Sequence, residues 1–243
     1  MNSYDIIIQQ GTLFDGTGGA CQIVDIGIKN GVVAEISTSP IKYENYPRII
    51  EAKGKWITPG FIDIHTHYDA EVEISPGLIE SVRHGVTSVV LGSCSLSMVS
   101  GNANDLADMF CRVEGIPSEV VKPLFEKIKD WDGPTEYLNH LSQLNLGPNI
   151  ACLLGHSTIR ASVMGMKRAL TKGLRPNSEE LKKMDDLLEE ALDVGFVGLS
   201  ISTLPWDKMD GDEFRSRPMP SVFSSWKEYR HLAKQLRKRG KVL

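Results

Sequence analysis

The chain has 243 residues, 41% of them apolar and 24% charged, which suits one or two folded domains and excludes a disordered chain. A formal net charge of −4 gives no general electrostatic reason to bind nucleic acid. No apolar run reaches the roughly 18 residues of a membrane span, and the first residues lack the basic-then-apolar order of a signal peptide. We therefore expect a cytoplasmic protein with neither a membrane nor a nucleic-acid partner.

Residues 1–55 are expected to form a small β-sandwich domain. Two short runs, 24–29 and 32–37, are rich in β-branched or alternating residues, as strands are. The dipeptide Asn30-Gly31 joins them, and both residue types tolerate the positive φ of a two-residue hairpin turn. This segment therefore predicts a β-hairpin.

Residues 56–243 repeat one unit, an apolar strand followed by a loop and an amphipathic helix. The predicted strands are 61–67, 87–94, 150–156 and 197–203, and the predicted helices are 78–84, 135–144, 179–194 and 226–239. Ser225 and Glu228 have the spacing of a capping box, and Ser178 precedes the third helix. Repeated units of this kind predict an α/β fold in which helices cover parallel strands.

The repeat is expected to be the first half of a (β/α)8 TIM-type barrel, of about four βα units. A closed barrel needs about 250 residues, more than follow residue 55. Residues 241–243 resemble the start of a fifth strand, so the barrel is expected to be incomplete in this chain. The alternative is an open parallel sheet of four or five strands that is complete as it stands.

His65 and His67 are the strongest candidates for metal binding. Because side chains alternate along a strand, they are expected to share one face with Asp63, while Ile62 and Ile64 pack outward on helices. Barrel enzymes build their active sites at the C-terminal end of the strands. Two imidazoles there can hold a metal such as zinc. The alternative is that both histidines are structural.

Cys94 ends the second predicted strand at the same height as the two histidines. A thiolate is a soft ligand that can bridge two metals. The alternative is an inert buried thiol. The predicted metal ligands are therefore His65, His67 and Cys94, holding one or two zinc ions.

His156 and Arg160 follow the third predicted strand and are the candidates for substrate binding. His156 is suited to contact substrate or a metal-bound oxygen, and Arg160 to pair with a substrate carboxylate in a forked geometry. The alternatives are a loop-ordering hydrogen bond and a structural ion pair.

Two long loops, 95–134 and 204–224, are expected at the same mouth. The second is either a lid or a solvated insertion, because a long polar loop is a common place for function. Its polar and aromatic residues are Trp206, Asp207, Asp210, Asp212, Arg215 and Arg217.

Three motifs occur in order: PGFIDIHTHYD at 59–69, GSC at 92–94 and GHSTIR at 155–160. With them the chain resembles the N-acyl-D-amino-acid deacylases (D-aminoacylase-like proteins) of the metal-dependent amidohydrolase superfamily, over essentially its whole length. The resemblance implies that His65 and His67 help to hold a metal and that Cys94 bridges two metal positions. Dihydropyrimidinase-like relatives usually bridge with a carboxylated lysine on the fourth strand, but residues 198–203, GLSIST, contain none.

The resemblance implies a zinc-dependent amidohydrolase that acts on linear C–N bonds other than peptide bonds. Its small-molecule substrates would be N-acyl-D-amino acids, cleaved to a carboxylate and a D-amino acid. Two further histidines and the general acid–base aspartate are expected beyond Leu243, so the chain alone is expected to be inactive. One alternative is a dihydropyrimidinase- or hydantoinase-like enzyme acting on a cyclic or another linear amide. Another is a non-catalytic fragment that associates through exposed edges of the half-barrel.

Overall fold

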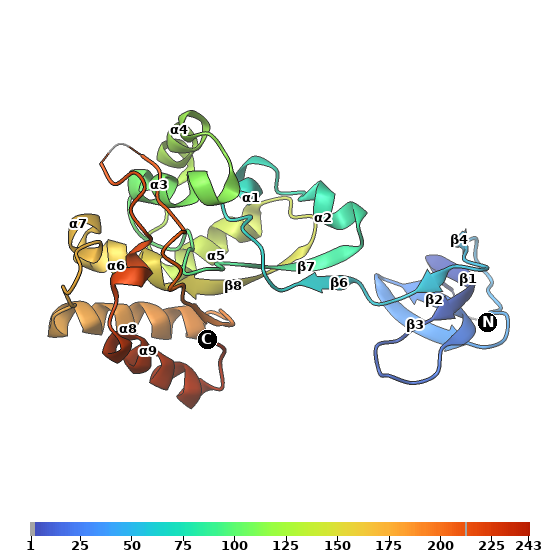
Figure 1. The fold of residues 1–243 in the computed structure, drawn as a ribbon. Helices are drawn as coiled ribbons and strands as arrows, with labels where there is room; N and C mark the ends of the chain where they lie inside the picture. Colours follow the sequence, from blue (N-terminus) through green and yellow to red (C-terminus); the bar gives the residue numbers. More distant parts are fainter. Residues whose placement is uncertain (1–2, 212) are drawn as a thin grey trace. The chain divides into compact units, whose positions relative to one another are not determined.

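The structure is a computed structural model that describes residues 3–211 and 213–243. The chain divides into two compact units, Met1–Gly60 and Phe61–Leu243 (Figure 1). This division lies later than the predicted one after residue 55. The reason is that β5 (Trp56–Ile57) pairs with β1 (Ile6–Leu13) and so belongs to the first unit.

The first unit contains one mixed sheet in the order β3-β2-β1-β4, with β5 also paired to β1. Its other strands are β2 (Gln22–Lys29), β3 (Val32–Ser37) and β4 (Arg48–Glu51). Within the described part of this unit the strands form a single sheet, so the predicted β-sandwich stays a prediction. The apolar cluster beside it is small and consists of Tyr4, Ile7 and Ile41.

The predicted hairpin is confirmed. Lys29 pairs with Val32 across a two-residue turn, in which Asn30 has φ 53° and Gly31 has φ 74°. Both angles are positive, as this turn requires, because such a turn follows the twist of the two strands.

The second unit contains a parallel sheet whose strands lie side by side in the order of the sequence. They are β6 (Phe61–Asp63), β7 (Val86–Leu91), β8 (Asn149–Gly155) and β9 (Gly198–Ser200). A parallel bridge between Val242 and Gly198 adds the expected start of a fifth strand. In a (β/α)8 barrel each parallel strand lies beside the next strand in the sequence, and the strands here have the same order. This α/β unit therefore fits a curled half-barrel.

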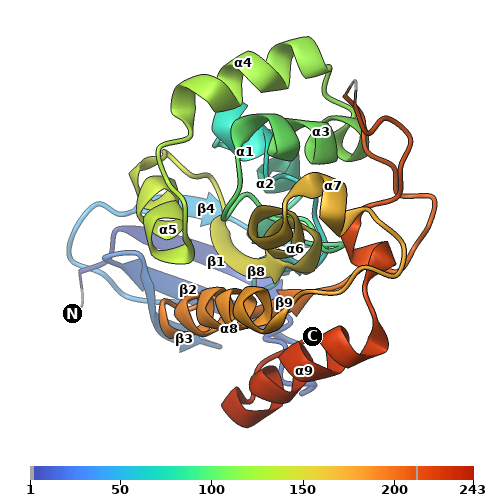
Figure 2. The same cartoon turned by 90° about the vertical axis from the view of Figure 1, so that its left-hand side faces the viewer.

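Helices connect the strands and bury their apolar stripes on the sheet. Figure 2 shows α5, α8 and α9 following one another along one side of the strands. Among the described residues, no helix combines the length and apolarity needed to cross a membrane. The helices are α1 (Glu71–Ile74), α2 (Ile79–Arg83), α3 (Ala103–Glu114), α4 (Ser118–Ile128), α5 (Pro134–Gln143), α6 (His156–Met164), α7 (Met166–Ala169), α8 (Ser178–Asp193), α9 (Trp226–Arg239) and the 3-10 helix η1 (Pro220–Phe223).

The four predicted helices are confirmed, but the prediction of a long loop at 95–134 is wrong. This segment contains α3 and α4, and α3 buries Leu106, Met109 and Phe110 on the face toward the core. Spacings of three and four residues are those of one helical face. Asn102 caps the start of this helix, because its side-chain oxygen accepts a hydrogen bond from the backbone N–H of Asp105.

The starts of α8 and α9 differ from the prediction. A complete capping box begins α8, but its residues are Asn177 and Glu180 rather than Ser178. At α9 the Ser225 hydroxyl accepts the backbone N–H of Glu228, which is half of a capping box. The Glu228 side chain takes other partners, described below.

The edge strand β6 exposes its apolar side chains. Ile62 is 65% exposed and Ile64 is 76% exposed. The expectation that both pack outward on helices is therefore wrong for this structure. By contrast, Val89 of β7, Leu154 of β8 and Leu199 of β9 are fully buried, so the core lies under these three strands.

Candidate metal centre

His65 and His67 lie just beyond the end of β6, which stops at Asp63 rather than at the predicted residue 67. The backbone N–H of His65 donates to the Asp63 carboxylate at 3.2 Å, and this bond accompanies the end of the strand. The two imidazole rings still lie together, with their centroids 5.4 Å apart and their planes at 65°. A short irregular segment, rather than an extended strand, therefore presents both rings.

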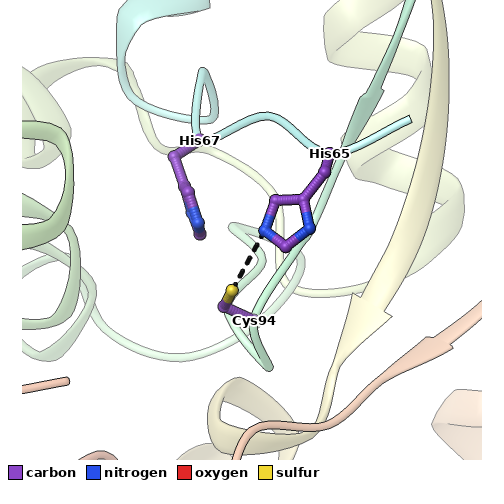
Figure 3. A group of neighbouring side chains, drawn as sticks. All are labelled: His65, His67 and Cys94. Carbon is purple, nitrogen blue, oxygen red and sulfur yellow. Dashed lines mark hydrogen bonds between the residues drawn. The ribbon is translucent and has the colours of Figure 1, made fainter. Parts of the chain in front are cut away.

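Cys94 lies beyond the end of the neighbouring strand β7 and completes a group of three donors. Its Sγ is 3.2 Å from Nε2 of His65 (Figure 3). One ligand atom from each of His65, His67 and Cys94 lies within 4.8 Å of the others. The structure thus brings together the three side chains that the sequence predicts as metal ligands.

Cys94 reaches this position through an unusual turn of the backbone. Cys94 has φ 52° and Ser95 has φ 71°, both left-handed. Such backbone costs about 1–3 kcal/mol for each non-glycine residue. Gly92 also has φ 82°, and a Cβ there would lie 2.0 Å from the carbonyl oxygen of Leu153. The turn therefore requires glycine at 92 and external hydrogen bonds around Cys94.

Three hydrogen bonds from two residues, Ser200 and Ser157, hold this turn. The backbone N–H of Ser95 donates to Oγ of Ser200 on β9 at 3.0 Å, and the same Oγ donates to the carbonyl oxygen of Gly92. The backbone N–H of Ser157 donates to the carbonyl oxygen of Ser95 at 2.8 Å. Because these partners are buried, the bonds are protected from competition with water.

Two further hydrogen bonds connect the histidine segment to the cysteine segment. The Thr66 hydroxyl donates to the carbonyl oxygen of Val90 at 2.7 Å, and the backbone N–H of Gly92 donates to the Asp69 carboxylate at 3.2 Å. Thr66 is 4% exposed and Asp69 is 1% exposed. The relative position of the ligands is therefore set by buried contacts on both sides of His67.

Glu114 at the end of α3 holds the chain immediately after Asp69. Its two carboxylate oxygens accept the backbone N–H groups of Ala70 and Glu71 at 2.9 and 3.0 Å. Burial and the nearby charge of Asp69 raise the pKa of Glu114 to about 9 despite these bonds. Burial likewise raises the pKa of Asp69 to about 7. The two carboxyl groups therefore share at most one negative charge near neutral pH.

The protonation of His67 and Cys94 bears on metal binding at this point. Burial, followed by the charge of His65, lowers the pKa of His67, so its imidazole is neutral and able to ligate. Among the described residues its Nδ1 is buried without a hydrogen-bond partner, which is costly unless a further partner binds there. Burial and the Asp207 carboxylate raise the pKa of the Cys94 thiol, so a metal that binds there must displace the thiol proton. Two imidazoles and one thiolate are donors that zinc accepts, so the residues present fit a metal ion.

A cavity of about 430 Å³ adjoins the group. His65 and Cys94 form part of its wall, together with residues 199–204 and the last two residues, Val242 and Leu243. A cavity of this volume is in the range of small-molecule sites. Two of the three donors, His65 and Cys94, therefore face a space that can admit a small molecule.

His156 and Arg160 lie elsewhere, fully buried in the interior. His156 contacts the Ser221 hydroxyl and the Glu228 carboxylate, each at 3.0 Å, and Arg160 donates to the same carboxylate at 2.6 Å. Both side chains are 0% exposed. Their functional atoms are already bonded within the fold, so this placement matches the alternatives of a loop-ordering hydrogen bond and a structural ion pair rather than contact with a substrate.

The charges in this cluster are adjusted to one another. Burial lowers the pKa of His156, which keeps the ring neutral. Burial acts to raise the pKa of Glu228, but hydrogen bonds from His156 and Arg160 outweigh it and lower the pKa. The result is a buried Arg160–Glu228 ion pair with a neutral histidine beside it.

The segment 204–224 is partly buried rather than a solvated loop. Met209 and Met219 are fully buried, and Lys208 forms a bridge with Pro218. The Ser202 hydroxyl donates to the Asp207 carboxylate at 3.1 Å, and Trp206 remains 68% exposed. The predicted residue Asp212 lies outside the described residues.

Sequence reasoning missed the residues that support the donors, chiefly Thr66, Asp69 and Ser200. Thr66 and Asp69 lie inside the recognised motif at 59–69, so their proximity to the histidines was available as a signal. Ser200 was noted only as part of a strand without lysine. Its contact with the Cys94 turn joins residues 105 positions apart, which no local pattern reveals.

Comparison with known proteins gives a consistent set of relatives, although no protein-family model matches the chain. An uncharacterized protein of Mycobacterium tuberculosis is 49% identical over 241 residues, which is 99% of this chain and 39% of the relative. A D-aminoacylase of Alcaligenes xylosoxydans xylosoxydans is 32% identical over 199 residues, 81% of this chain and 37% of that enzyme.

A solved structure agrees with these relatives. The N-acyl-D-glutamate deacylase from Bordetella bronchiseptica, complexed with zinc and a phosphonate inhibitor, superimposes with a TM-score of 0.75. It is 25% identical and the match covers 99% of this chain and 44% of the deacylase. The chain thus spans less than half the length of the proteins that it matches.

Proposed function

We propose that the intact protein is a metal-dependent amidohydrolase that cleaves N-acyl-D-amino acids. The premise is that this chain belongs to the D-aminoacylase-like family of the amidohydrolase superfamily. The products would be a carboxylate and a free D-amino acid. The single observation that carries the proposal is the convergence of His65, His67 and Cys94 within 4.8 Å beside a cavity.

The three donors would hold zinc, as one or two ions. In this proposal His65 and His67 would supply neutral nitrogen ligands, and Cys94 would supply a sulfur ligand. The chemistry that bound zinc supplies is polarisation of the amide carbonyl and a lower pKa for a coordinated water. The zinc complex of the related N-acyl-D-glutamate deacylase supports this choice of metal.

The remaining roles fall to other parts of the chain. Thr66, Asp69 and Ser200 orient the segments that carry the donors through their buried hydrogen bonds. Proton transfer from water to the leaving amine needs a general acid–base group near the bond that breaks. We expect an aspartate beyond Leu243 to supply it, as the family resemblance implies, and two further histidine ligands to come from the same part of the protein.

Substrate and metal assays on the intact protein test this function. The panel would contain matched N-acetyl-D- and N-acetyl-L-amino acids, with hydantoins and dihydropyrimidines as the competing class. We expect turnover of the D-enantiomers together with bound zinc. Faster turnover of the cyclic amides would overturn the substrate class.

The metal site is tested separately by substitution. Cys94→Ala should remove most of the metal and of the activity, whereas Cys111→Ala, which alters a buried thiol with no role in the site, should keep the metal. Full zinc occupancy and unchanged activity in Cys94→Ala would rule out the proposed role of the thiol.

A further inference from the structure

We propose that Ser200 is the residue that positions Cys94 as a ligand, so that the serine on β9 and the cysteine after β7 work as a pair. This inference rests on the proposed metal function, because Cys94 needs a fixed direction only if its sulfur binds. Ser200 lines the cavity beside the donors, but its hydroxyl is bonded to backbone groups rather than to one of the three donors. It acts through the backbone on both sides of Cys94.

The Ser200 hydroxyl makes one hydrogen bond on each side of the cysteine. The Ser200 hydroxyl accepts the N–H of Ser95, the residue after Cys94, at 3.0 Å. It also donates to the carbonyl oxygen of Gly92, two residues before Cys94. One hydroxyl therefore closes the turn that contains the left-handed residues Cys94 and Ser95. Without it, a buried N–H and a buried carbonyl would lose their partner.

The position of Ser200 is itself fixed. Ser200 is the last residue of β9, is 8% exposed and pairs with Gly155 of β8. The turn is bonded to the start of α6 as well, through the N–H of Ser157 and the carbonyl oxygen of Ser95. The Cys94 turn thus rests on the ends of two neighbouring parallel strands, which are rigid parts of the unit.

The chemistry of the contact explains why a hydroxyl is needed at this position. A hydroxyl donates one hydrogen bond and accepts others, so it satisfies the Gly92 carbonyl and the Ser95 N–H together. A lysine ammonium only donates and would leave the Ser95 N–H without an acceptor. Alanine satisfies neither group. An uncarboxylated lysine at 200 would therefore leave a buried N–H of the Cys94 turn unsatisfied.

A residue that positions a ligand can be told from one that only stabilises the fold by the measurements that each affects. A residue that holds a ligand changes metal affinity and the metal–sulfur signal, and its effect disappears when the ligand is absent. Outer partners of metal ligands typically change affinity by about 10- to 100-fold. A purely structural residue would change the stability of the metal-free protein and leave the metal–sulfur signal intact.

The test uses Co²⁺ titrations of the metal-free intact protein, followed by the sulfur-to-cobalt charge-transfer absorption. Ser200→Ala should lower Co²⁺ affinity about 10- to 100-fold and weaken this absorption. Ser200→Thr, which keeps the hydroxyl, should retain both. Ser100→Ala is the matched control, because Ser100 is a buried serine of the same segment whose hydroxyl donates to Ser162 at 3.0 Å.

Two further variants keep the test decisive. If Ser200→Ala does not fold, Ser200→Thr and Ser200→Val have nearly equal volume and differ in the hydroxyl, so tighter binding by the threonine variant supports the pair. In a Cys94→Ala background the Ser200→Ala change should have no further effect on affinity. Equal affinity and absorption in wild type and Ser200→Ala, or in the threonine and valine variants, would overturn the positioning role alone.

A different result would overturn the metal function as well. If Cys94→Ala shows the same affinity and the same charge-transfer absorption as the wild type, the sulfur is not a ligand, and the proposed site and the role of Ser200 both fail. The two failures are therefore told apart by whether the wild-type signal depends on Cys94.

Discussion

Thr66 and Val90 join the two segments that carry the candidate ligands, because the buried Thr66 hydroxyl donates a 2.7 Å hydrogen bond to the Val90 carbonyl oxygen. Thr66→Val keeps the volume and removes this donor. We expect the free energy of unfolding to fall by about 1–3 kcal/mol, since a buried carbonyl loses its partner. Urea denaturation measures the change, with Thr171→Val as an exposed control. Equal losses in both variants would contradict the assigned contact.

The buried Arg160–Glu228 ion pair predicts a large effect of breaking it. Arg160→Ala leaves the Glu228 carboxylate in the interior without its cation, so the free energy of unfolding should drop by about 3–5 kcal/mol. Arg239→Ala breaks exposed pairs with Glu189 and Asp193 and should cost no more than about 1 kcal/mol. Chemical denaturation of both variants checks this, and a small loss for Arg160→Ala would mean that the pair does not form.

The glycine before the Cys94 turn predicts a steric effect. In Gly92→Ala the new Cβ would lie 2.0 Å from the Leu153 carbonyl oxygen at φ 82°, so β7 and β8 must separate. We expect a loss of about 3 kcal/mol or more in the free energy of unfolding. Gly115→Ala has a similar φ of 67° with no atom within 4 Å and should cost only about 1 kcal/mol. Comparable thermal shifts in the two variants would argue against the close approach.

Glu114 predicts a dependence of stability on pH. Its folded pKa of about 9 lies above the ordinary value of 4.5, so the folded state keeps a proton that the unfolded chain releases. The resulting stabilisation is complete below the unfolded pKa and is lost as pH rises toward about 9. Asp69, with its pKa raised to about 7, acts in the same direction.

Glu114→Gln removes this titration and should flatten the slope of unfolding free energy against pH between these values. Denaturant unfolding at several pH values measures the slope, and Glu179→Gln, on an exposed carboxylate paired with Lys183, serves as the control. An unchanged slope in Glu114→Gln would show that Glu114 is ionised in the folded protein at neutral pH.

Much of the second unit could be predicted from periodicity, because each βα unit carries a local signal. The α9 range matches the prediction from Trp226 to Arg239, and Gly240 ends it in the left-handed conformation. The helices α3 and α4 were not predicted, because no helix-start residue was identified in the long segment between β7 and β8. Asn102 provides that signal in the structure.

The donors of the candidate site could be predicted because residue type and position at a strand end are local properties. The sequence left open whether His156 and Arg160 bind substrate or form structural contacts, and it could not name Glu228 as their partner, because Glu228 lies 72 and 68 residues further along the chain. The same limit applies to Ser200. The register of the parallel sheet places β9 beside β8. This register brings the Ser200 hydroxyl to the Cys94 turn.

The backbone and the side chain of Glu228 make contacts in different parts of the unit, and this affects the order of folding. Its backbone N–H takes part in a local helix cap, while its carboxylate binds two residues of α6. Contacts between distant positions form slowly because they close a long loop. The first turn of α9 therefore gains its full stability only after α6 has docked, so the last βα unit is expected to become protected from hydrogen exchange later than the third.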